Sequence, residues 1–149
     1  MKPGLTEIWV FLAQSPLLWL SLTLLAYLAA HDESFGSKQN RFTVLTVVRP
    51  IPARAADALA NKIVHGYYTE EAEATLKPIR AFFAKQGFDA EFEHHVGDAG
   101  EQIAAFARKG KFDLVVMGSH GHGALARLVV GSVTGRVLAS CEVPLLIVH

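Results

Sequence analysis

The feature that most constrains the fold is the stretch of residues 113–137, with the sequence DLVVMGSHGHGALARLVVGSVTGRV. It begins with an apolar run at residues 114–117, which is too short for a helix and ends at Gly118. Such a run predicts a strand that is buried on both faces. A glycine-rich loop follows, and Gly131-Ser132 then opens a second apolar stretch with helical character. A strand that leads through glycines to a helix N-terminus favours an anion site, because the free N–H groups and the positive end of the helix dipole attract a phosphate.

The other interpretation of these glycines is a tight turn that binds no ligand. Their spacing excludes the two best-known phosphate-binding motifs. No lysine follows the last glycine, as a P-loop requires, and GSHGHG does not match GxGxxG. The spacing that is present is G-x-x-G, then nine residues, then G-S, carried by Gly118, Gly121, Gly131 and Ser132. Together with the lead-in VVMGSHG and the C-terminal VPLLIVH, this pattern resembles the universal stress protein family, specifically its ATP-binding branch. The resemblance is strong over residues 41–149 and weak over the very hydrophobic residues 1–40.

The resemblance implies a single α/β domain over residues 1–149. Its expected core is an open parallel five-stranded sheet in the order 3-2-1-4-5, with helices on both faces, in the Rossmann-like arrangement of the adenine-nucleotide alpha-hydrolases. The alternation of strand and helix patterns along the chain agrees with that class. The resemblance also implies an ATP site, with or without Mg²⁺, formed by Val47, Met117, Gly118, Ser119, His120, Gly121, Gly131, Ser132 and Val133.

One position of the implied site departs from the family pattern. In the family, the turn after the first strand carries an aspartate that helps to position the nucleoside, and Ala13 stands at the corresponding place here. Losing one such hydrogen bond is expected to cost about 1–3 kcal/mol, roughly ten- to a hundredfold in affinity. A nucleotide-free interaction module therefore stays open as an alternative.

Residues 8–30 contain no charged residue. As one helix they would span about 35 Å, enough to cross a hydrocarbon core of about 30 Å and to tether the protein to the inner membrane. Pro16 interrupts the run, however, and no small-residue cleavage site precedes His31, so a secretory signal is not indicated. The competing interpretation is a strand at residues 8–12 and a helix at residues 17–30. We favour it, because the resemblance places the first strand in the middle of the sheet, where its absence would leave two neighbours unpaired. An N-terminus that is aberrant for this fold is the third alternative.

The elements after the N-terminal run follow from periodicity and caps. Residues 41–48 are rich in β-branched residues and predict a second buried strand, which a proline-containing loop at residues 49–54 follows. The next helix-compatible stretch should break at residues 65–68. A second helix should then begin at Thr69 and end at Gly87.

Residues 88–96 alternate between apolar and polar side chains and predict a half-exposed strand at the edge of the sheet. Its adjacent histidines, His94 and His95, point to opposite faces of a strand and cannot chelate one metal ion. Asp98 follows, with Glu101 three residues later, and this spacing predicts the N-cap of a helix.

Composition and side-chain pairs argue against several functions. Lys plus Arg and Asp plus Glu both number 14, so no basic field for a nucleic-acid backbone is expected. Ser119 and His120 have no identifiable acid to orient the imidazole, and His120 and His122 lack a third ligand, so we expect neither catalysis nor a metal site. The only cysteine, Cys141, lies in an apolar neighbourhood typical of a core residue and fits a reducing compartment.

Taken together, the resemblance implies a cytoplasmic, ATP-binding protein of the stress response that acts as a regulatory dimer and not as an enzyme. The sequence shows no candidate general base and no candidate set of metal ligands for ATP hydrolysis. In the family, the last strand, here Leu145–Val148, commonly pairs with its copy in a second subunit, so a homodimer is expected. A membrane-tethered stress module anchored by residues 8–30 is the remaining alternative.

Overall fold

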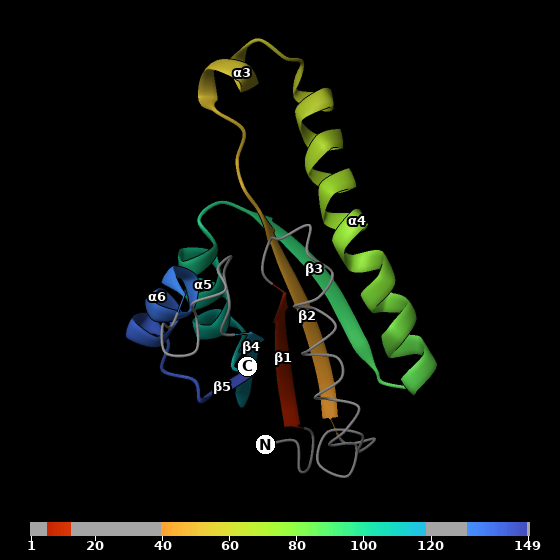
Figure 1. The fold of residues 1–149 in the computed structure, drawn as a ribbon, viewed down its shortest axis with the longest axis vertical. Helices are drawn as coiled ribbons and strands as arrows, with labels where there is room; N and C mark the ends of the chain where they lie inside the picture. Colours follow the sequence, from red (N-terminus) through yellow and green to blue (C-terminus); the bar gives the residue numbers. More distant parts are fainter. Residues whose placement is uncertain (1–5, 13–39, 119–130, 149) are drawn as a thin grey trace.

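The computed structural model describes residues 6–12, 40–118 and 131–148 of the chain (Figure 1). In chain order, the elements are β1 (Thr6–Leu12), β2 (Asn40–Val48), α3 (Ala53–Asp57), α4 (Asn61–Gln86), β3 (Ala90–Val96), α5 (Ala99–Gly110), β4 (Leu114–Gly118), α6 (Ser132–Ser140) and β5 (Leu145–Val148). The strands form one sheet in the order β3-β2-β1-β4-β5, and every neighbouring pair is parallel. The predicted α/β class is confirmed.

Strand β1 occupies the centre of the sheet. It pairs with β2 along its whole length, in seven register pairs, and with β4 in four. The predicted strand at residues 8–12 is therefore confirmed, and one continuous membrane helix over residues 8–30 is wrong. The predicted helix at residues 17–30 lies outside the described residues. Within the described part of the chain, no helix has the length and apolar character needed to cross a bilayer.

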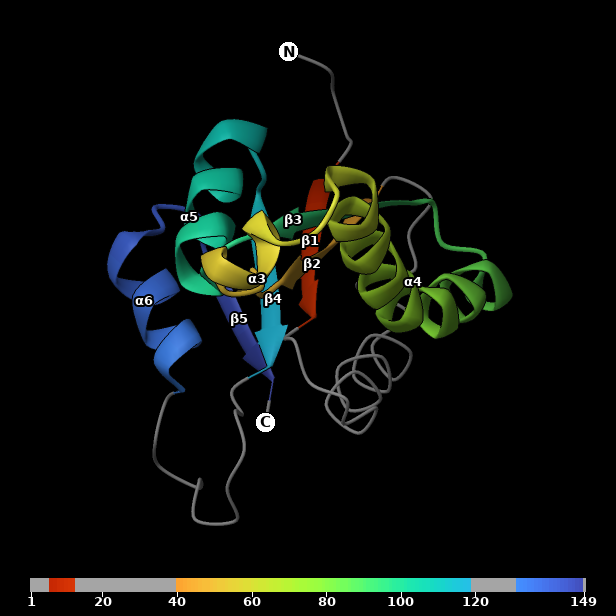
Figure 2. The same ribbon diagram turned by 90° about the horizontal axis from the view of Figure 1, so that it is seen from above.

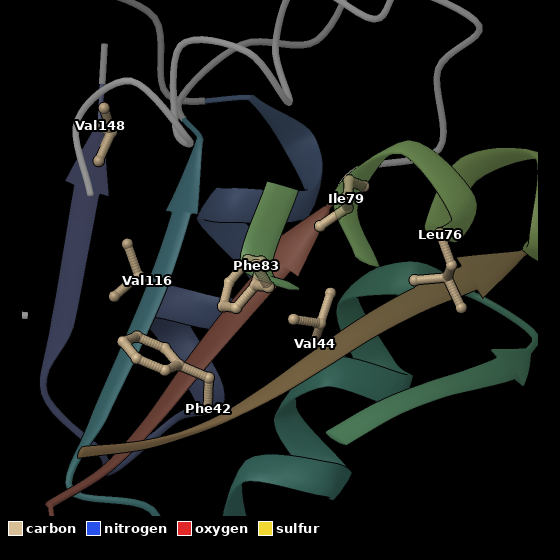
Figure 3. Packing of buried hydrophobic residues seen from close by; sticks show 7 residues of the cluster. All are labelled: Phe42, Val44, Leu76, Ile79, Phe83, Val116 and Val148. Carbon is tan, nitrogen blue, oxygen red and sulfur yellow. The ribbon is translucent and has the colours of Figure 1, made fainter. Parts of the chain in front are cut away.

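Helices cover both faces of the sheet, with α4 on one side and α5 and α6 on the other (Figure 2). The core cluster under α4 consists of Phe42, Val44, Leu76, Ile79, Phe83, Val116 and Val148 (Figure 3). The core cluster under α5 and α6 consists of Leu45, Val47, Ile103, Ala107, Val115, Met117 and Val137. Strands β2 and β4 contribute to both clusters, so they are buried on both faces, as the β-branched run of residues 41–48 and the apolar run of residues 114–117 predict.

Helix α4 differs from the prediction. It is one helix over Asn61–Gln86, without the break predicted at residues 65–68. Thr69 is not an N-cap, because its hydroxyl donates to the carbonyl oxygen of His65 at 3.0 Å within the helix. A glycine such as Gly66 lowers helix stability by only about 1 kcal/mol, which tertiary packing of the helix outweighs. The residues that anchor α4 are Ala72, Leu76, Ile79 and Phe83, all of which are buried.

The connection from β2 to α4 contains the short helix α3, which begins inside the loop predicted at residues 49–54. Pro52 is its N-cap, next to the position where the fixed φ of proline suits a helix start. Tyr68 holds this connection to α4, because its hydroxyl accepts a hydrogen bond from the N–H of Ile51 at 3.1 Å. Helix α3 and the N-terminal turns of α4 extend beyond the sheet (Figure 1).

Strand β3 lies at an edge of the sheet, as predicted, and α5 follows it through the predicted cap. The carboxylate of Asp98 accepts a hydrogen bond from the N–H of Glu101 at 3.1 Å. It also accepts one from Arg136 of α6 at 2.7 Å. Chiefly through the Glu101 N–H, and further through Arg136, the pKa of the Asp98 carboxyl lies below its ordinary value of 3.8.

Candidate functional site at the carboxyl edge of the sheet

The strand order places a switch point between β1 and β4. From β1 the chain runs outward through β2 to β3, and it then returns past β1 to β4 and continues to β5. In open parallel sheets, ligands bind at the carboxyl ends of the strands at such a point. Strand β4 ends there at Gly118, and α6 begins at the same edge of the sheet (Figure 2). Gly118 and Gly131, the two motif glycines that the structure describes, therefore lie at the edge where a ligand is expected.

A hydrogen bond joins the end of β4 to the first turn of α6. The hydroxyl of Thr134 donates to the carbonyl oxygen of Gly118 at 3.2 Å, across 16 residues of sequence. Thr134 is 3% exposed. The contact holds the helix start against the strand end, and the motif glycine Gly131 is the N-cap of that helix.

Neither described motif glycine is required by its backbone conformation. Gly131 has φ −57° and ψ 156°, which other residues adopt without strain. Gly118 is not among the described glycines with positive φ. Apart from its chain neighbours, a Cβ atom added to Gly118 would meet no atom of the described residues within 4 Å. The described fold therefore leaves open space in front of Gly118.

The first turn of α6 presents backbone donors at the same edge. The first N–H groups of any α-helix lack an acceptor within the helix, and here they belong to Ser132, Val133 and Thr134. The first helical hydrogen bond runs from the Gly135 N–H to the Gly131 carbonyl oxygen at 2.8 Å. Gly131 supplies no side-chain cap, and the first turn contains no acidic residue. With the positive end of the helix dipole, this arrangement favours an anion such as a phosphate.

The remaining predicted site residues fall into three groups. Val47 and Met117 are 0% and 1% exposed, and their side chains belong to the cluster under α5 and α6. Any contact of these two with a ligand would therefore use the backbone. Ser132 is exposed at the start of α6, and Val133 packs half-buried against the same cluster. Outside the described residues lie Ala13, Ser119, His120 and Gly121.

Two residues at the start of α6 carry hydroxyl groups, Ser132 and Thr134, and only Ser132 belongs to the predicted site. The structure shows that Thr134 is the one buried between helix and strand. A signal was present, because Thr134 precedes Val137 by three residues, which places both on one face of the helix, and Val137 is fully buried. No feature of the sequence predicts that the Thr134 hydroxyl binds the Gly118 carbonyl oxygen on β4.

A separate hollow of about 720 Å³ lies between β3 and α5, and none of its lining residues belongs to the motif. Several of its polar side chains pair with one another. Arg41 lies 3.2 Å from Glu91, and His95 Nδ1 lies 3.1 Å from Gln102 Oε1. Charged side chains of this kind keep an edge strand solvated. In the described ranges, no group of three or more His, Cys, Asp or Glu side chains is placed to hold a metal ion.

Comparison with known sequences gives a family match. The model of the Universal stress protein family matches residues 22–149. Universal stress protein Slr1230 of Synechocystis is 38% identical over 76 residues, which are 51% of this chain and 26% of that protein. Universal stress protein MJ0577 of Methanocaldococcus jannaschii is 34% identical over 117 residues, which are 78% of this chain and 71% of that protein. The chain thus spans about a quarter of the length of the Synechocystis relative.

Solved structures share the fold at lower sequence identity. The MJ0577 structure superposes with a TM-score of 0.73 at 23% identity and covers 97% of this chain and 96% of that one. A universal stress protein of Arabidopsis thaliana with AMP bound has a TM-score of 0.67 at 12% identity, with coverage of 96% and 90%. The Archaeoglobus fulgidus protein in complex with dAMP has a TM-score of 0.60 at 18% identity, with coverage of 97% and 98%. At these identities the likeness establishes the fold.

Proposed function

The chain belongs to the universal stress protein family, and from this we propose that it binds an adenine nucleotide, with ATP as the expected ligand, between β1 and β4. The relatives that carry AMP and dAMP share the fold and support adenine as the base. The observation that carries the proposal is the space that the described residues leave open in front of Gly118, beside the start of α6. The family motif has glycine at a position where the described residues leave room for a side chain and the backbone does not require glycine, so we attribute the glycine to the ligand.

Each residue of the proposed site has a role that follows from its place. The first-turn N–H groups of α6 and the Ser132 hydroxyl bind the phosphates. Val47 and Met117, near the carboxyl ends of β2 and β4, contact the adenine through their backbone. By the family pattern, Ser119, His120 and Gly121 complete the phosphate loop. A magnesium ion would be held mainly by phosphate oxygens, as is usual for Mg²⁺ with nucleotides.

We further propose that the protein is a nucleotide-dependent regulatory homodimer of the stress response and not an enzyme. Strand β5 lies at the edge of the sheet opposite β3 and carries only apolar residues, Leu145–Val148. Edge strand β3, by contrast, carries Glu91 and Glu93. An uncharged apolar edge favours pairing with a second copy, whereas a charged edge opposes it.

Light scattering after size exclusion tests the dimer. The expected mass is twice the chain mass of 16.2 kDa. A monomer over the whole accessible concentration range would contradict the proposal.

The cytoplasm is the expected compartment, and carbonate extraction of cell fractions tests it, because a membrane-anchored chain stays in the pellet.

The alternative function is a nucleotide-free interaction module, and Ala13 in place of the family's aspartate is the observation that favours it. Equilibrium dialysis with labelled ATP separates the two functions. Binding by the wild type that Gly131→Trp abolishes supports the nucleotide site. If the wild type does not bind, Ala13→Asp becomes decisive: a gain of binding shows a site that lost its ligand with the aspartate, and no gain supports the nucleotide-free module.

A further inference from the structure

Thr134 is a polar residue in an apolar environment. It is 3% exposed, and Val137, three residues later on the same face of α6, is fully buried. Valine has nearly the shape of threonine and no hydroxyl to satisfy. A buried hydroxyl costs stability unless it is hydrogen-bonded, and here it donates to the Gly118 carbonyl oxygen at 3.2 Å. Packing alone therefore does not explain a threonine at this position.

The hydrogen bond affects two sets of groups at the candidate site. The Gly118 carbonyl oxygen is an acceptor at the end of β4, and the first turn of α6 carries N–H groups that lack helical acceptors. Gly118 is half-buried. Without the Thr134 hydroxyl, its carbonyl oxygen would accept from another donor, because backbone carbonyls are strong hydrogen-bond acceptors. The N–H groups of the adjacent helix turn are donors of the right kind. A carbonyl that captured one would remove a phosphate donor and would bring its own partial negative charge toward the phosphate.

We propose that Thr134 is a positioning residue of the nucleotide site. Its hydroxyl occupies the Gly118 carbonyl oxygen and so leaves the first-turn N–H groups of α6 available to the phosphates. This role rests on the proposed function, because it concerns the same site. Thr134 acts through the carbonyl and the helix turn. Because the N–H groups of that turn bind the phosphates in the proposed site, the effect of Thr134 is specific to ligands that carry phosphate.

The test compares Thr134→Val, which removes the hydroxyl, with Thr134→Ser, which keeps it, in the full chain. Competition binding gives the Kd of ATP and of adenosine for each protein. We expect Thr134→Val to raise the Kd of ATP about tenfold, the effect of one hydrogen bond. Adenosine, which has no phosphate, should change by less than about twofold. Thr134→Ser should bind ATP within about twofold of the wild type.

Several results would overturn the positioning role. These are an unchanged ATP affinity in Thr134→Val, an equal loss for ATP and adenosine, and a failure of Thr134→Ser to retain ATP binding. Each of them leaves the proposed function standing, because the wild type still binds. A wild type that does not bind ATP would overturn both proposals. Should Thr134→Val not fold, Thr134→Ser and Thr134→Ala make the same comparison, since these two differ only by the hydroxyl.

Discussion

The substitution Gly118→Ala tests whether the motif glycines serve the fold or the ligand. It adds one methyl group at the end of β4, where no atom of the described residues, chain neighbours aside, lies within 4 Å of the new Cβ. Gly118 is also absent from the described glycines with positive φ, so the backbone accepts alanine. We expect the free energy of unfolding to stay the same or to rise by about 0.4–1 kcal/mol, because alanine restricts the unfolded chain.

The same methyl group should weaken ATP binding. If the ligand fills the space in front of Gly118, the methyl group must displace it or strain the site. Overpacking of this kind costs about 1–3 kcal/mol, so the Kd for ATP should rise about five- to 150-fold. Equilibrium dialysis with labelled ATP measures the Kd, and urea unfolding of the empty protein measures the stability.

Gly135→Ala is the matched control for Gly118→Ala. Gly135 lies in α6, and outside the nearby backbone of that helix a Cβ there likewise meets no described atom within 4 Å. Alanine should stabilise the helix by about 1 kcal/mol and leave the Kd for ATP within about twofold of the wild type. A Gly118→Ala protein that folds and binds ATP as tightly as the wild type would refute the assignment of this space to a ligand.

Three further predictions concern the fold. Phe83→Ala removes a ring that is 1% exposed in the cluster under α4, and urea titration should show a loss of about 3–5 kcal/mol; a loss below about 1 kcal/mol would contradict the packing. Gly87→Ala places a Cβ at φ 72° at the C-cap of α4 and should lower the melting temperature through a strain of about 1–2 kcal/mol. Gly66→Ala, inside the same helix, should raise the melting temperature, because outside the nearby helix backbone a Cβ there meets no described atom within 4 Å. Asp98→Asn keeps a capping residue but removes the charge. The folded pKa of Asp98 lies below its ordinary value of 3.8, chiefly because of the Glu101 N–H. The charge therefore stabilises the fold above that value, and the advantage of the wild type over Asp98→Asn should shrink as the pH falls below about 3.8; a constant difference across that range would show that the charge is not responsible.

The sequence predicts the strands best where a short run is apolar or β-branched and shows no regular polar alternation. Residues 41–48 and 114–117 correspond to β2 and β4, because a strand buried on both faces shows no polar alternation and is too short for a helix. The start of α6 at Gly131-Ser132 is predicted equally well, since an apolar sequence pattern with helical character begins there after the glycine-rich loop. Cys141, expected in the core, is half-buried and borders the cluster under α5 and α6.

The errors occur where a contact distant in sequence decides the local structure. The segment around Gly66 resembles a helix break, yet α4 continues through it. The Tyr68 hydroxyl in that segment binds the Ile51 N–H, 17 residues away, and no local pattern contains this contact. The same limit applies to the site. The motif predicted a site at the carboxyl edge of the sheet, where the end of β4 and the start of α6 meet, but the bond between Thr134 and Gly118 depends on how α6 packs against β4.

The composition of the apolar N-terminal run permits both a strand and a membrane helix, and its neighbours in the fold determine which one forms. Backbone polar groups must be paired wherever water is excluded, and a membrane helix pairs them internally. Strand β1 pairs them with β2 and β4 instead, in seven and four register pairs. A central strand of a sheet covered on both faces also requires apolar residues at successive positions, so the lack of charge at residues 8–12 agrees with either structure. Pairing with β2 and β4 therefore favours the strand over the membrane helix. These two strands can belong to one parallel sheet in this order only when a strand lies between them.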